Sequence, residues 1–196
     1  GVVAPQLYAD LAILDASLPL GLPPAVTAAT GIDAMVHAIE AYTSRLQKNP
    51  LSDMLATQAL SLLSANLVTA CRDGQNLAAR QAMLLGAMLA GQAFSNAPVA
   101  AVHALAYPIG GLFRVPHGLS NALVLPHVLR FNLSHAAPLY AQLAAVLQPG
   151  ITGSDEARAH ALIDAMQDIA LATGIARTLR EVGIAASDLD RLADEA

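Results

Sequence analysis

Residues 31–42 read GIDAMVHAIEAY and carry three side chains with acid–base or metal-binding chemistry. Asp33 and His37 are four residues apart, and Glu40 follows three residues after His37. On an α-helix, residues i and i+4 lie on one face, so a carboxylate oxygen and an imidazole nitrogen can converge on one divalent cation. An acidic residue near a helix N-terminus beside an unrelated histidine gives the same pattern. These two residues alone leave both interpretations open.

Two further histidines favour the metal site. His103 lies in the apolar stretch AVHALAYPIGG, with no charged residue between Arg80 and Arg114, and His117 follows 14 residues later in a Pro-His-Gly sequence. One carboxylate with three imidazoles suits Fe²⁺ or Zn²⁺ and leaves a position for a substrate oxygen. The alternative is a helical bundle in which the histidines only pack. We assign the remaining histidines to no site: His127, His135 and His160.

The elements that must position these residues read as helices. Thr30-Gly31 predicts a break in the first helix, because glycine costs about 1 kcal/mol relative to alanine inside a helix. Pro108 and the pair Gly110-Gly111 predict the end of the helix that carries His103. Residues 11–14 form an apolar run that is either a strand or an extended crossing segment. The expected helices cover residues 25–45, 52–71, 77–94, 99–106, from 119 onward, 135–147, 156–173 and a final pair. The prediction is an all-α bundle.

Composition excludes several classes of protein. The chain has 196 residues, of which 55% are hydrophobic and 13% charged, with a formal net charge of −5. A disordered chain or a nucleic-acid binder does not show this balance. The single cysteine, Cys71, excludes a disulfide framework and suits a reducing cytoplasm.

We expect neither a membrane span nor a signal peptide. Residues 81–113 carry no charge, but polar residues and prolines interrupt the apolar run well before the roughly 20 residues that a bilayer needs. The chain opens on Gly1 without a basic region leading an apolar one, which gives no sign of a signal peptide.

Several ordered motifs resemble one family, the iron-containing (group III) alcohol dehydrogenases. The resemblance covers residues 11–149 and rests on GIDAMVHAIEAY, NPLSDMLATQAL, MLLGAMLAGQAFSNA and AVHALAYPIGGLFRVPHGLSNALVLPHVLRFN. It implies the dehydroquinate synthase-like helical domain that forms the C-terminal half of such enzymes.

The resemblance also implies functional residues and a reaction. The family's metal ligands fall on Asp33, His37, His103 and His117, and its substrate-side aromatic falls on Phe94. Asn96 and the turn at Gly110-Gly111 keep their family identities. The implied reaction is reversible hydride transfer between NAD or NADP and a small alcohol or aldehyde, with Fe²⁺ or Zn²⁺ polarising the oxygen. The implied assembly is a cytoplasmic homodimer.

One departure from the family concerns proton transfer. Tyr107 stands where members often have a histidine near the nicotinamide, and tyrosine, with a reference pKa near 10, is a poorer proton carrier at neutral pH. Tyr107 and His117 are the candidate catalytic residues.

A second departure concerns the cofactor, because no glycine-rich phosphate loop follows a strand. We expect residues 1–20 to be the remnant of an interdomain segment and 21–196 to be the metal domain. The N-terminal nucleotide-binding domain is then absent from this chain, which also stops short of the family's last helix. Such a fragment is inactive alone and exposes an apolar face.

Three alternatives stay open. One is an inactive metal-binding helical domain. The others are sister activities, maleylacetate reductase or hydroxyacid dehydrogenase. Maleylacetate reductases commonly lack the aspartate at the position of Asp33, which favours the alcohol dehydrogenase branch.

Overall fold

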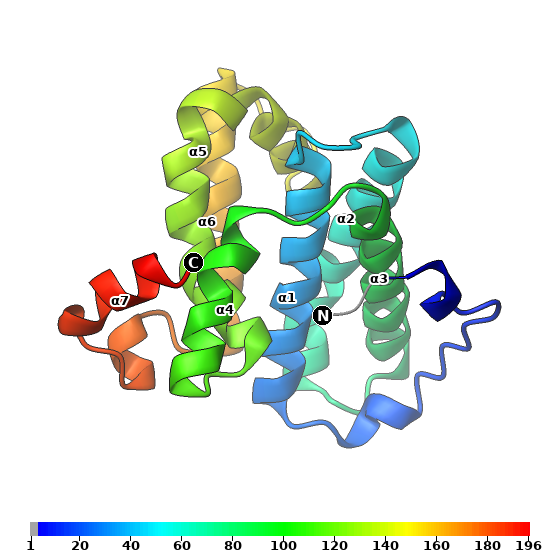
Figure 1. Ribbon diagram of the computed structural model, residues 1–196. Helices are drawn as coiled ribbons and strands as arrows, with labels where there is room; N and C mark the ends of the chain where they lie inside the picture. Colours follow the sequence, from blue (N-terminus) through cyan, green and yellow to red (C-terminus); the bar gives the residue numbers. More distant parts are fainter. Residues whose placement is uncertain (1–3) are drawn as a thin grey trace.

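The computed structural model describes residues 4–196 and contains only helices as regular secondary structure over that range (Figure 1). The expected all-α class is therefore confirmed. The α-helices are α1 (Pro24–Thr43), α2 (Pro50–Arg72), α3 (Leu77–Asn96), α4 (Ala101–Phe113), α5 (His117–Leu147), α6 (Asp155–Thr173) and α7 (Leu189–Asp194). Short 3₁₀ turns occupy Pro5–Leu7, Leu18–Gly21, Leu179–Val182 and Ala186–Asp188.

Helix α1 is the centre of the bundle. It packs against α2 and α3 on one side and against α5 and α6 on the other, while α4 packs along α5 (Figure 1). Alanines and long aliphatic side chains make the buried core, including Met35, Ile39, Leu60 and Leu143. Small residues allow close helix approach, so the side chains of α1 are held from both sides.

The predicted break at Thr30-Gly31 is wrong, because α1 is continuous through both residues. Gly31 is buried, and a Cβ atom there would meet the side chains of Leu67 and Met83. Gly31 therefore allows α2 and α3 to pack closely against α1 and does not end a helix.

The predicted ends at proline are also wrong. Helix α4 runs through Pro108 and both following glycines to Phe113, and ends at Arg114 in the left-handed conformation, with φ 58°. Helix α5 is one helix with Pro126 and Pro138 inside it, where two were expected. A proline inside a helix costs about 3 kcal/mol, but both helices bury apolar side chains along their length, and that packing outweighs the local preference.

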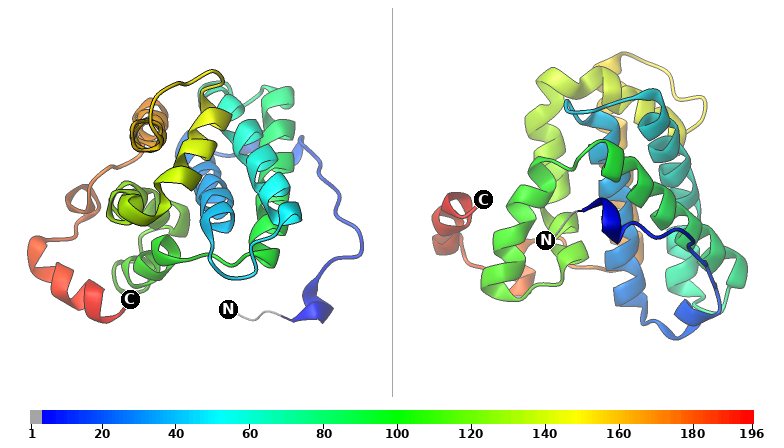
Figure 2. Two further views of the ribbon diagram at one scale, coloured as in Figure 1. Left: turned by 90° about the horizontal axis from the view of Figure 1, so that it is seen from above. Right: turned by 45° about the vertical axis from the view of Figure 1, so that its right-hand side comes forward.

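The segment before α1 and helix α7 lie on opposite sides of the bundle (Figure 2). The N-terminal segment passes outside α3, and α7 projects beyond α4 and α5 (Figure 2). Residues 11–14 are extended and pair with no strand in the described part of the chain. Their side chains are exposed, with Leu11 at 77% and Ile13 at 82%.

Length and composition alone make α2 the single helix of residues 4–196 that could cross a membrane. Its apolar face is accounted for within the bundle, because Leu60, Leu63 and Leu67 are fully buried and the helix packs against α1 and α3. The charge-free stretch 81–113 forms two helices, α3 and α4, separated by residues 97–100.

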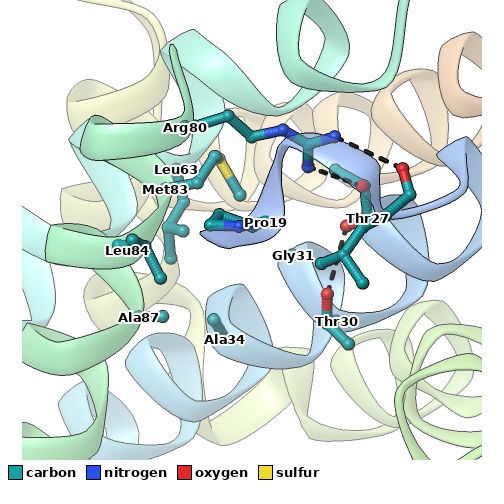
Figure 3. A pocket seen from close by; sticks show the side chains of 11 residues that line it. Pro19, Thr27, Thr30, Gly31, Ala34, Leu63, Arg80, Met83, Leu84 and Ala87 are labelled. Atoms are coloured by element: carbon teal, nitrogen blue, oxygen red, sulfur yellow. Dashed lines mark hydrogen bonds between the residues drawn. The ribbon is translucent and has the colours of Figure 1, made fainter. Parts of the chain in front are cut away.

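A buried arginine fixes the start of α1. The Arg80 guanidinium donates to Thr27 Oγ1 at 2.7 Å (Figure 3). It also donates to the carbonyl oxygens of Gly74 and Leu22. These bonds join α3 to the entry of α1 beside a small cavity of about 100 Å³. No candidate ligand lines that cavity, so it belongs to the packing that orients α1.

Candidate metal centre

Three helices bring the four predicted ligand residues together. Asp33 and His37 project from α1, His103 from α4, and His117 from the first residue of α5. One nitrogen or oxygen atom of each lies within 4.8 Å of the others. Asp33 Oδ1 is 3.8 Å from the Nε2 atoms of both His103 and His117.

These separations fit a divalent ion. Bonds of about 2.1 Å in tetrahedral geometry place ligand atoms about 3.4 Å apart, only a few tenths of an ångström below the 3.8 Å observed. One carboxylate and three imidazoles are also the donor set that Fe²⁺ and Zn²⁺ accept. The residues present therefore fit such an ion.

The side chain of Asn121 lies among the ligand atoms. Its Nδ2 atom donates to Asp33 Oδ1 at 2.5 Å and is 3.2 Å from the Nε2 atoms of both His103 and His117. Its own oxygen is buried and has no hydrogen-bond partner among the described residues. The ligand lone pairs thus converge on a region where the amide already presents partial positive charge.

Glu40 stands behind the site and is itself buried. Its Oε2 atom lies 2.6 Å from His103 Nδ1, on the side of the imidazole opposite the ligand cluster. Its Oε1 atom accepts the backbone N–H of Val102 at 2.7 Å, in the first turn of α4. A carboxylate therefore joins the C-terminal half of α1 to the start of α4.

Burial favours the neutral form of the His37 imidazole. Desolvation is the largest influence and lowers the pKa of His37, the negative charge of Asp33 raises it, and the neighbouring imidazoles of His103 and His117 lower it. A neutral imidazole is the form that can donate a lone pair to a cation. The environment of His37 therefore favours its role as a ligand.

Aromatic rings line the remaining sides of the cluster. The Phe94 ring stacks on His37 with centroids 4.6 Å apart, and Tyr107 stacks on His117 at 5.9 Å. The Tyr107 side chain is 61% exposed, so its hydroxyl is accessible from outside the bundle. Phe94, the predicted substrate-side aromatic, and Tyr107, a candidate catalytic residue, both lie against ligand imidazoles.

An open cavity begins beside two of the ligands. It has a volume of about 440 Å³ and lies between the starts of α1 and α5 and residues 174–176. Asp33 and His117 line it together with apolar residues such as Val26 and Ile175. The cluster is therefore accessible from this side. Within residues 4–196, no cluster of metal-ligating side chains includes His127, His135 or His160.

Sequence reasoning missed two members of the site. Glu40 was noted for its spacing but given no role, and Asn121 was seen only as part of a motif. Both carried a signal, because Glu40 lies on the same face of α1 as His37, and Asn121 follows His117 by one helical turn.

Comparison with known proteins decides the family. Residues 27–196 match the Fe-containing alcohol dehydrogenase family, C-terminal. The chain belongs to this family. The 1,3-propanediol dehydrogenase of Klebsiella pneumoniae is 42% identical over 188 residues, which are 95% of this chain and 48% of that protein.

Two other members of the family are similar to this chain over more than nine-tenths of its length. Long-chain-alcohol dehydrogenase 1 of Geobacillus thermodenitrificans is 42% identical over 191 residues, 97% of this chain and 48% of that protein. The solved structure of an alcohol dehydrogenase from Oenococcus oeni matches with a TM-score of 0.89 at 37% identity, over 92% of this chain and 47% of that one. The chain thus spans about half the length of its relatives in the Fe-containing alcohol dehydrogenase family, and the resemblance to a C-terminal helical domain is confirmed.

Proposed function

We propose that this chain is the metal-binding half of an NAD- or NADP-dependent alcohol dehydrogenase that interconverts a small alcohol and its aldehyde or ketone. The observation that carries the proposal is the convergence of Asp33, His37, His103 and His117 within 4.8 Å. Membership of the Fe-containing alcohol dehydrogenase family supports it. Relatives named for 1,3-propanediol and for long-chain alcohols support an alcohol as the substrate class.

The four residues would hold Fe²⁺ or Zn²⁺, each through one atom. Such an ion supplies a Lewis acid that polarises the oxygen of the substrate. Asp33 contributes the one negative charge among the four, and the histidines contribute ring nitrogens, from a buried position for His103 and a partly buried one for His37. The apolar surroundings of His103 keep water from that side of the site, which strengthens electrostatic stabilisation at the reacting oxygen.

Three residues form the substrate side in this proposal. Phe94 provides an apolar wall against His37, and His117, half exposed, faces the open side of the cluster. Tyr107 Oη, exposed beside His117, would hold or pass the proton that enters or leaves with the alcohol. A phenol does this less readily than an imidazole at neutral pH, because its reference pKa is near 10.

The hydride must come from a cofactor held outside the described helices. Residues 4–196 contain no strand followed by a glycine-rich phosphate loop. We therefore propose that an α/β half outside these residues holds the dinucleotide. We also propose a cytoplasmic homodimer as the complete assembly.

A second candidate is a metal-binding helical domain with no activity of its own. The observation that favours it is the coverage of about half of each relative. The two candidates share the metal site and differ in whether joining a nucleotide-binding half produces turnover.

Metal content tests both candidates. We expect about one equivalent of iron or zinc per chain after anaerobic purification, measured by elemental analysis, and less than about one-tenth of that in an Asp33→Ala, His37→Ala variant. The matched control is His135→Ala, His160→Ala, which removes two exposed imidazoles outside the cluster and should keep the metal.

Activity then separates the two candidates. The chain is joined to the N-terminal half of the Klebsiella pneumoniae 1,3-propanediol dehydrogenase, and aldehyde-dependent oxidation of NADH is measured. Turnover that is lost in the Asp33→Ala, His37→Ala variant supports the enzyme. A joined protein that holds metal without turnover supports the inactive domain, and one that holds no metal contradicts both.

A further inference from the structure

Glu40 uses its two carboxylate oxygens for two different partners. Oε1 accepts the N–H of Val102 at 2.7 Å, and Oε2 lies 2.6 Å from Nδ1 of His103. The side chain is only 4% exposed, so no bulk water competes for either bond. The first bond caps α4, whose N-cap residue Ala100 has no capping side chain. The second bond reaches the back of a candidate ligand.

The bond to His103 selects one form of that imidazole. An ionised carboxylate only accepts hydrogen bonds, so His103 Nδ1 must carry the hydrogen. In a neutral imidazole the other nitrogen, Nε2, is then left with its lone pair. That lone pair faces Asp33 and the rest of the cluster, since Nε2 is the atom 3.8 Å from Asp33 Oδ1.

The opposite side of the ring is compatible with the same form. Nδ2 of Asn121 is 3.2 Å from His103 Nε2, and an amide NH₂ group only donates. The orientation of that amide is fixed by its 2.5 Å bond to the Asp33 carboxylate. Its two hydrogens are shared among Asp33, His103 and His117, so the Glu40 carboxylate is the neighbour that assigns the hydrogen of His103 to Nδ1.

We infer that Glu40 is a positioning residue that holds His103 with Nδ1 protonated and Nε2 directed at the metal. The inference rests on the proposed function, because that proposal places the metal at this site. Hydrogen bonds from a ligand's second nitrogen to a carboxylate fix ring orientation and raise ligand basicity. Among the described residues, neither His37 nor His117 has a carboxylate hydrogen-bonded to its second ring nitrogen, so this support is confined to His103.

The two roles of Glu40 can be separated with Glu40→Gln. Glutamine has the same shape but only one accepting oxygen. The Val102 N–H can only donate, so it should take that oxygen, and the NH₂ group then points at His103 Nδ1. The cap on α4 is kept, while His103 is driven to the opposite tautomer with its hydrogen on Nε2. In that form Nε2 cannot bind a cation.

The first measurement is the ¹⁵N spectrum of the histidine side chains in the metal-free chain, with His103 identified by a His103→Gln variant. We expect protonated Nδ1 and unprotonated Nε2 in the unaltered chain, and the reverse in Glu40→Gln. The second measurement is Zn²⁺ affinity by chelator competition, which should fall about 10- to 100-fold in Glu40→Gln. The urea midpoint of the metal-free variant should stay close to that of the unaltered chain, because the cap remains.

Glu156→Gln is the matched control, since it makes the same chemical change at an exposed position in the first turn of α6. It should change neither measurement. The inference is overturned if the unaltered chain carries the His103 hydrogen on Nε2, which can be observed without any Glu40 variant. It is equally overturned if Glu40→Gln leaves the tautomer or the Zn²⁺ affinity unchanged.

Failure of the proposed function looks different. The metal site is contradicted if the chain never binds Zn²⁺. If Glu40→Gln still reverses the His103 tautomer in that case, Glu40 remains supported as the residue that determines this tautomer.

Discussion

At the scale of single residues, Asn121 links the candidate ligands through an amide rather than a charge. It is fully buried, follows His117 by one helical turn and contacts three of the four ligand residues. A neutral donor here balances one carboxylate without adding a second charge to the site. The charge of this position is therefore a property that can be altered without altering its shape.

Asn121→Asp should lower the stability of the metal-free chain and increase the stabilisation that a bound metal provides. The substitution puts a carboxylate oxygen where an NH₂ group now lies 2.5 Å from Asp33 Oδ1. The lost hydrogen bond and the buried like charge should lower the free energy of unfolding by about 1–3 kcal/mol. An added divalent cation relieves that repulsion, so Zn²⁺ should raise the urea midpoint of the variant more than that of the unaltered chain.

Asn66→Asp on α2 is the control, because the Asn66 amide donates only to a backbone carbonyl, that of Leu62, away from the cluster. Asn66→Asp should change the urea midpoint little, both without and with Zn²⁺. Equal midpoints of Asn121→Asp and the unaltered chain in the absence of metal would contradict the account of Asn121.

The ligand residues could be predicted from the sequence, but the residues that hydrogen-bond to them could not. Asp33 and His37 share a helix at a spacing that fixes their common face, and the family resemblance adds His103 and His117. Glu40 and Asn121 are also on the correct faces, but their roles depend on partners 63 and 88 positions away in the chain. Helical spacing cannot supply contacts of that kind, because they come from how α4 and α5 dock on α1.

At the scale of elements, the docking of α5 on α1 depends on Gly118. A Cβ atom at this position would overlap the backbone of Ala29, with the carbonyl carbon at 2.7 Å, and would approach Asp33 Cβ at 3.2 Å. Two helix backbones therefore meet where only hydrogen fits, and the residue before this contact is the ligand His117. The distance from His117 to Asp33 is set by that close approach.

Gly118→Ala should destabilise the chain and loosen the site together. Overpacking of this kind costs about 1–3 kcal/mol, and moving the start of α5 away from α1 should separate His117 from Asp33. We expect a lower urea midpoint and a clear loss of Zn²⁺ affinity. Gly111→Ala is the matched control, because a Cβ there meets nothing within 4 Å. As an alanine inside a helix, it should raise stability by about 0.5–1 kcal/mol and leave the affinity unchanged.

The helices were predicted well where side-chain pattern governs them and poorly where glycine or proline lies inside them. The cores of α2, α3 and α6 fall where apolar periodicity placed them. The breaks assigned to Gly31, Pro108 and the middle of α5 do not exist. The free-energy cost of glycine or proline inside a helix predicts a break at each place. Packing against helices that are distant in the sequence outweighs that cost.

At the scale of the whole molecule, the segment before α1 is the least integrated part of the described chain. Its backbone passes along the outside of α3 (Figure 2). Between residues 7 and 18 it exposes large apolar side chains: Leu7, Tyr8, Leu11, Ile13 and Leu18. The sequence predicts a remnant of an interdomain segment here, and this stays a prediction. Pattern alone could not tell a strand from an extended segment, because that depends on a pairing partner.

This segment should make the chain associate. Exposed apolar side chains close together are a favourable surface for self-contact, and an extended backbone also offers unpaired hydrogen-bonding groups. In sedimentation velocity experiments, we expect the average mass to rise above the 20.2 kDa of one chain as concentration increases. Leu11→Ser, Ile13→Ser should return it toward a single chain.

The control for this test removes apolar surface elsewhere. Leu46→Ser, Met54→Ser replaces two exposed apolar side chains near the start of α2 and should leave the association unchanged. An unaltered chain that stays at one mass across the concentration range would contradict the prediction. Equal effects of the two double variants would show that total apolar surface, rather than this segment, governs association. If the segment governs association, joining the N-terminal half of the Klebsiella pneumoniae relative should suppress it, because that half would cover the same apolar side chains.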